Sequence, residues 1–454
     1  MEEKRVIRGE GLSRRDFIKT GLAGAAAWGI GSLPVDARAQ KALEVKPEKD
    51  AVLRVLRWAV FVKSDQEVWD KNTKKWEELT GNKVITEYIA WDDLRAKAAM
   101  DASVGAGHDI IIGWQDDPHL YPQKLMDLTD LAGYLGQKSG GWESVCSMYG
   151  MDAKTKRWIA LPIGAVVAVM NYRISWMKEA GFEKFPGKIP DFLTLAKKLK
   201  ANGHPVGFAL GKAQGDANSF WHYWLWSFGG KMVEKDGVTL CLNKRETWSA
   251  LEAGRELYDT MIPGVASWLD PHNNKAFLAG EVSVTQNSIS IYYAAKEKFP
   301  DIAADMDHAI MPIGPIGRST EAYSMSQAFI FQHTRFPQAA KHYLLHMLGA
   351  PQYGAWIEAM IGFTAPNTND YKKLPFWTSD PKITLCRDAL SRMLWNGYAG
   401  PMGPASAAVM AEYIVVDMFA DVCVGGKSPQ AAAAAAQDRA ARYYKLPKSK
   451  GSAK

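Results

Sequence analysis

The sequence predicts an α/β fold with two lobes, each lobe a sheet flanked by helices. The first observation is length, because the chain has 454 residues and a single hydrophobic core stops growing at about 250–300 residues. The second observation is that short apolar runs alternate with segments of helical periodicity, which is typical of sheets covered by helices.

The first part of the chain alternates between strands and helices. We predict a strand over 52–61, a helix that begins at the S-x-x-E capping box Ser64–Glu67, and a strand over 84–89. A helix from about Asp92 and an all-apolar strand over 110–112 follow. This order predicts βαβ units with right-handed crossovers.

The segment 158–172 is extended around a Pro/Gly break, which predicts a crossing between lobes. A second α/β region follows it. Its predicted helices cover 190–199, 219–228 and 246–261, its strands cover 206–210 and 282–286, and later elements are a strand over 327–332 and helices over 337–348 and 430–444.

The N-terminal residues predict an export signal rather than part of the fold. Adjacent Arg14 and Arg15 precede Asp-Phe-Ile-Lys and a weakly apolar run over 21–33, which is shorter than the roughly 20 residues that span a bilayer. A small-x-small pattern ends at Ala39. We therefore expect a twin-arginine signal peptide over 1–39, cleaved after about Ala39, and a periplasmic protein.

Charge and cysteine content exclude several classes of function. The net charge of +6 is mild and scattered, without the basic run typical of a nucleic-acid partner. No C-x-x-C pair occurs, so the sequence supports neither a metal finger nor a thioredoxin-like site. Either Cys386 and Cys423 form a disulfide, or both are buried thiols.

Four segments carry patterns in an order that is typical of one family. They are His108–Asp116, Leu161–Arg173, Phe277–Asn287, and Ile310–Pro315 followed by Pro337–Leu348 and Gly362–Pro366. Together they resemble the extracellular solute-binding proteins of carbohydrate ABC importers, the maltose-binding-protein-like family. Asn171-Tyr172 reverses the family's usual Tyr-Asn, and Val166 stands where maltodextrin-binding members present a carboxylate, so a maltodextrin preference does not follow.

The resemblance implies a periplasmic binding protein fold whose lobes are joined by three crossings and close over a solute. We expect residues 50–163 and 324–365 in the N-terminal lobe, and residues 164–323 and 366–445 in the C-terminal lobe. The implied solute is a sugar or sugar-like compound, and the implied partners are an ABC permease and, indirectly, a separate ATPase chain. The alternatives are a polyol, polyamine or glycerol phosphate, or an exported carbohydrate-active enzyme.

The sequence also indicates what the protein does not need. It contains no G-x-S-x-G, no phosphate-binding loop and no G-x-G-x-x-G after a strand, so we expect a binding protein rather than an enzyme and no cofactor. His342 and His346 are four residues apart on a predicted helix, but no third ligand lies nearby, so we expect no metal site.

Sugar recognition requires aromatic rings and Asp, Asn or Gln side chains, because sugars present flat C–H faces and a rim of hydroxyls. Trp114 to Asp117 supply both types just after a strand, where α/β sheets bind ligands. The alternatives are core packing for Trp114 and helix capping for Asp92. The candidate ligand-binding residues are Trp114, Gln115, Asp116, Asp117, Trp91, Asp92, Asn218, Trp221, Asn287, Tyr292, Tyr323, Trp395 and Tyr398.

Overall fold

The structure is a computed structural model that describes residues 43–59 and 62–444. The expected export signal, with Arg14, Arg15 and Ala39, lies outside these residues. No helix within the described ranges is both long enough and apolar enough to span a bilayer.

The first sheet has six strands in the order β2-β1-β3-β8-β4-β9. Strand β1 pairs in parallel with both β2 and β3, whereas β8 lies antiparallel between β3 and β4. The strands are β1 (Val52–Trp58), β2 (Lys83–Ile89), β3 (Ile110–Gly113), β4 (Leu161–Val166), β8 (Ser324–Ile330) and β9 (Thr364–Ala365). The predicted βαβ order of the first part of the chain is therefore confirmed.

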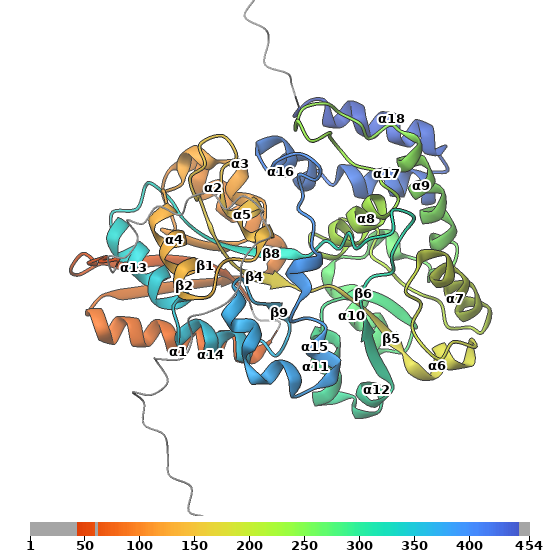
Figure 1. The fold of residues 1–454 in the computed structure, drawn as a ribbon, viewed down its shortest axis with the longest axis horizontal. Helices are drawn as coiled ribbons and strands as arrows, with labels where there is room; N and C mark the ends of the chain where they lie inside the picture. The colour runs from red at the N-terminus through yellow and green to blue at the C-terminus, as the bar shows by residue number, and fades with distance from the viewer. Residues whose placement is uncertain (1–42, 60–61, 445–454) are drawn as a thin grey trace, which may run out of the picture. The chain divides into compact units, whose positions relative to one another are not determined.

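Helices cover this sheet, and with it they form the first lobe. In Figure 1, α1 and α14 lie on one side of the strands and α2 on the other. The helices of this lobe are α1 (Lys63–Thr80), α2 (Leu94–Val104), α3 (Asp117–Leu120), α4 (Thr129–Lys138), α5 (Ser144–Gly150), α13 (Pro337–Leu348) and α14 (Gln352–Ala359). The predicted capping box is absent: α1 begins after Val62, and the Ser64 hydroxyl instead donates to the carbonyl of Ala359 at 2.6 Å.

The second sheet has three antiparallel strands in the order β6-β5-β7, namely β5 (Val169–Arg173), β6 (Val284–Asn287) and β7 (Met306–Ala309). With its helices it forms the second lobe. The strand predicted over 206–210 is instead an isolated bridge between Val206 and Met261. The other helices are α6 (Ile174–Glu179), α7 (Ile189–Ala201), α8 (Asp216–Ser227), α9 (Arg245–Tyr258), α10 (Asp270–Leu278), α11 (Ser290–Lys298), α12 (Pro300–Ala304), α15 (Pro381–Thr384), α16 (Pro404–Ala411), α17 (Ile414–Cys423) and α18 (Pro429–Ala440).

Helix α8 is the most aromatic element of the chain, and every residue from Ala217 to Ser227 is buried. Helices α9 and α17 and strand β6 pack around it. A helix that is apolar all round must be enclosed on all sides. This helix is therefore the centre of the second lobe's core.

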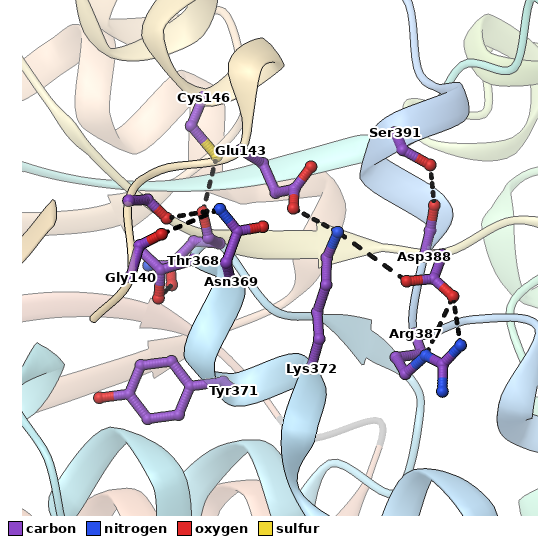
Figure 2. A network of polar contacts seen from close by, with 12 residues as sticks. Gly140, Glu143, Cys146, Thr368, Asn369, Tyr371, Lys372, Arg387, Asp388 and Ser391 are labelled. Atoms are coloured by element: carbon purple, nitrogen blue, oxygen red, sulfur yellow. Dashed lines mark hydrogen bonds and ion pairs between the residues drawn. The ribbon is translucent and has the colours of Figure 1, made fainter. Parts of the chain in front are cut away.

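The chain passes from β4 to β5, returns from β7 to β8, and leaves the first sheet again after β9. Figure 2 shows the residues that follow this last exit, held against the loop before α5. Lys372 forms ion pairs with Glu143 and, at 3.9 Å, with Asp388, and Asn369 donates to the carbonyl of Gly140 at 3.1 Å. The start of the predicted segment 366–445 thus contacts the first lobe.

Every cysteine is a free, buried thiol in the described residues. The disulfide between Cys386 and Cys423, one of the two alternatives that the sequence left open, is absent. Burial raises the pKa of both thiols to about 12. Both side chains therefore behave as small apolar core residues.

Candidate ligand-binding site

A cavity of about 40 Å³ lies where elements of the two sheets meet. The first lobe contributes Trp91, Val166, Ser324 and Phe363, and the second contributes Gly215, Asp216, Asp270, Asn274, Asn287, Ser288 and Ser290. Aromatic side chains therefore come from one lobe, and carboxylates and amides come from the other. Trp91 directly follows Ala90 at the carboxyl end of β2, the edge at which α/β sheets bind ligands.

Asp270 occupies its place because the amino end of α8 needs an acceptor. Its carboxylate accepts hydrogen bonds from the backbone N–H groups of Gly215 at 3.0 Å and Asp216 at 2.9 Å. The side chain of Trp91 bonds to the same carboxylate, which links the two lobes directly across the cavity. Burial raises the pKa of Asp270 to about 6, and these hydrogen bonds oppose that shift.

Asp216 is surrounded by amide side chains. Its Oδ2 accepts from Asn273 Nδ2 at 2.7 Å and from Asn287 Nδ2 at 3.4 Å. Asn287 Nδ2 also donates to Asn273 Oδ1 at 2.7 Å and to Asn274. Burial and the charge of Asp270 raise the pKa of Asp216 well above its ordinary value. The structure thus places Asn287, at the end of β6 as expected, in the cavity wall.

The aromatic wall of the first lobe has two layers. The ring centroids of Trp91 and Trp114 are 4.1 Å apart with an edge contact, and Trp91 also lies 5.3 Å from Trp58. Trp114 is only 2% exposed and is absent from the cavity wall. It therefore supports Trp91, and Trp91 is the ring that faces the cavity.

Asp116 and Asp117 have a different role from the one that the sequence suggested. Both are fully buried, and Arg95 of α2 donates to Asp116 Oδ1 and to Asp117 Oδ1, each at 2.6 Å. Burial raises the pKa of Asp116 to about 6 in spite of Arg95. Gln115 is also buried, and its carbonyl accepts from Gln327 at 3.2 Å. Asp116 and Asp117 thus form ion pairs with Arg95 inside the first lobe, and neither carboxylate lines the cavity.

Arg95 also reaches the second lobe. With its amide orientation assigned from the hydrogen-bond network, Gln214 accepts from Arg95 Nη1 at 2.8 Å and Nη2 at 2.9 Å, and donates to the Tyr413 hydroxyl at 2.6 Å. This chain of hydrogen bonds is a second direct link between the lobes. The sequence offered no signal for it, because each member comes from a separate element.

On α8, Asn218 and Trp221 were expected to face the cleft. Asn218 is buried and donates to the carbonyl of Gln214 at 3.2 Å, and Trp221 is fully buried against Phe419, with ring centroids 4.5 Å apart. Trp221 is therefore a core residue, because α8 is enclosed on every side. Asp92 is exposed beside the cavity, where its charge raises the pKa of Asp270.

The remaining candidates stabilise the surroundings rather than the cavity wall. Tyr292 donates to Asp380 at 2.9 Å, and Tyr323 accepts from Arg392 at 3.5 Å. Trp395 donates to the carbonyl of Gly400 at 2.7 Å, and Tyr398 accepts from Arg318 at 2.6 Å. Sequence reasoning missed Asp216, Asp270, Asn274, Ser288, Ser290, Ser324 and Phe363, which carry no local pattern that separates them from ordinary turn and cap residues.

Comparison with known proteins decides the family. The family model described as bacterial extracellular solute-binding protein matches residues 71–384. The chain belongs to the bacterial extracellular solute-binding proteins. This confirms the resemblance found in the sequence.

A Brucella abortus protein, named as a binding protein, is 28% identical over 264 residues, which is 56% of this chain and 61% of the relative. The chain thus spans about 61% of the length of this relative and of two further Brucella proteins. Two solved structures share the two-lobed fold. A sugar transporter from Arthrobacter chlorophenolicus, with bound laminaribiose, has a TM-score of 0.74 at 17% identity and covers 87% of this chain and 99% of its own. An ABC transporter solute-binding protein from Agrobacterium radiobacter, in complex with ribitol, has a TM-score of 0.69 at 19% identity and covers 87% and 100%.

Proposed function

We propose that this protein is the periplasmic substrate-binding component of an ABC importer and captures a small polyhydroxylated solute between its lobes. The observation that carries the proposal is the composition of the cavity wall, which combines Trp91 and Phe363 of the first lobe with carboxylates and amides of the second lobe and hydroxyls of both. Rings stack on the C–H faces of such solutes, and the polar groups bind their hydroxyls. The laminaribiose and ribitol of the two related structures support this class of ligand.

Capture requires the lobes to move. A cavity of about 40 Å³ is much smaller than the ~300–1,000 Å³ of typical ligand sites. We place the hinges where the chain passes between the sheets, at 167–168, 310–323 and just after β9, close to the predicted lobe boundaries. Opening would break the bonds of Asp270 to Trp91 and of Gln214 to Arg95, and closure over a solute would restore them.

Delivery and location complete the proposal. The closed form docks on membrane permease subunits, and a separate ATPase chain drives transport. Export through the Arg14-Arg15 segment, with cleavage after about Ala39, places the protein in the periplasm. The competing function, an exported carbohydrate-active enzyme, predicts product formation from glycans, whereas a binding protein returns its ligand unchanged.

A thermal-shift screen against monosaccharides, disaccharides and polyols tests the proposal. A ligand at 100 times its Kd adds about 2.7 kcal/mol of stability, which raises the Tm. Trp91→Ala should remove this shift. Trp248→Ala is the matched control, because Trp248 is also half-buried with its indole N–H bonded to a polar side chain, Asn243, at 2.9 Å. Equal loss in both variants, or turnover of the ligand, would contradict the proposal.

A further inference from the structure

Three carboxyl groups at the cavity have no cationic partner in the part of the chain that the structure describes. Asp270 and Asp92 lie close enough to Asp216 to raise its pKa, and Asp92 also raises the pKa of Asp270. Among the described residues, no lysine or arginine forms an ion pair with any of the three. The nearest buried cation, Arg95, is bonded to Asp116 and Asp117.

The amide donors around the cavity are already used. Asn273 Nδ2 donates to Asp216 and to the carbonyl of Gln286 at 3.0 Å, and Asn287 Nδ2 donates within the same cluster. Asn274 Nδ2 donates to Ser290 Oγ at 3.0 Å. The second-lobe side of the cavity therefore presents mainly hydrogen-bond acceptors to a ligand. Such a wall fits a ligand that is rich in hydrogen-bond donors.

One carboxylate oxygen stands out within this wall. Both protein hydrogen bonds to the Asp216 carboxylate fall on Oδ2, so Oδ1 has no protein partner among the described residues. Both oxygens of Asp270, in contrast, accept backbone N–H groups. Asp216 is therefore the group with an acceptor to offer a ligand, and Asp270 holds the amino end of α8 in place.

We propose that the solute carries a protonated amino group that binds Asp216 Oδ1. An ammonium group has three donors, no acceptor and a positive charge, which matches a wall of acceptors whose carboxyl groups have no cationic partner. The ring of Trp91 adds attraction for a cation. This inference rests on the proposed function and specifies its ligand as an aminated solute, such as an amino sugar or a small polyamine.

Binding of a cation should release protons. The raised pKa values of Asp216 and Asp270 mean that the unliganded cavity holds protons more readily than free carboxyls do. The charged groups that act on Asp216 are Asp270 and Asp92, both of which raise its pKa, and His272 lowers the pKa of Asp92. An ammonium group lowers these pKa values, whereas a neutral solute that only displaces water raises them.

The test uses pairs of solutes that differ only in amine and hydroxyl groups: glucosamine with glucose, and 1,4-diaminobutane with 1,4-butanediol. Thermal shift and calorimetry at pH 7.5 and low salt should show binding of an amine about 10–100-fold tighter than of its hydroxyl partner. Calorimetry of that amine in phosphate and in HEPES, neither of which has a primary amine, should show proton release, because the two buffers differ in ionisation heat.

Substitution of Asp216 tests whether this residue binds the amino group. Asp216→Asn should weaken amine binding about 10–100-fold. Asp191→Asn is the control, since Asp191 also lies in the first turn of a second-lobe helix, α7, but is exposed and does not line the cavity. Tighter binding of the neutral members, or full amine affinity in Asp216→Asn, would overturn the inference and leave the proposed function intact. Failure of every solute in the pairs and in the wider sugar and polyol screen would contradict both.

Discussion

Replacement of Arg95 by Met tests the link between the buried charges and stability. The change keeps most of the apolar stem but removes both 2.6 Å hydrogen bonds to Asp116 and Asp117, whose side chains are fully buried. Removal of one partner from a buried ion pair typically costs about 3–5 kcal/mol. Asp116 Oδ2 and Asp117 Oδ2 have no hydrogen-bond partner to compensate. We therefore expect the free energy of unfolding at pH 7 to fall by about 3–5 kcal/mol.

Urea unfolding followed by tryptophan fluorescence measures this loss. Asp116→Asn and Asp117→Asn on the Arg95→Met background should recover much of it, because they remove the stranded charges. Lower pH should also recover part of it, because protonation neutralises the carboxylates. A loss below about 1 kcal/mol, the range of a surface ion pair, would refute the assignment of these groups as a buried, mutually dependent cluster.

Three further changes have defined outcomes. Asp65→Ala should cost about 3–5 kcal/mol in urea unfolding, since it strands the fully buried Arg57. Gly164→Ala should lower the Tm, because Gly164 has φ of +134° and a Cβ there would meet the carbonyl of Ala365 at 2.6 Å. Folding raises the pKa of Asp116 to about 6. Between about pH 4 and 6 the folded state therefore binds more protons than the unfolded state. As the pH rises through this range, the free energy of unfolding of the wild type should fall more than that of Asp116→Asn.

The spacing of apolar residues predicted the main features of the fold, because neighbouring residues of one helix or strand determine which of its faces is buried. The apolar run Ile110–Ile112 is typical of a strand covered on both faces, and the structure buries all three residues. The same logic could not orient Trp221, because a helix enclosed on every side has no face that the sequence marks as exposed. The predicted strand over 206–210 failed because a single bridge forms there.

The site was only partly predictable, because its geometry depends on partners that are distant in the chain. The sequence suggested Trp91 from its place just after a strand, and the family resemblance suggested Asn287 at a strand end; both line the cavity. Asp116 looked like a ligand-binding carboxylate until Arg95, 21 positions earlier, proved to be bonded to it. Asp216 and Asp270 are 54 positions apart and meet only because one binds the backbone N–H of the other at the amino end of α8.

The position of β8 between β3 and β4 determines when the first sheet can form during synthesis of the chain. Residues 324–330 emerge from the ribosome after all three strands of the second sheet, yet they fill the interior of the first. Until then β3 and β4 expose unpaired edges, which invite association with other chains. The sheet that begins first is therefore completed after the second sheet. A nascent chain that stops before residue 324 should depend on chaperones to remain unaggregated.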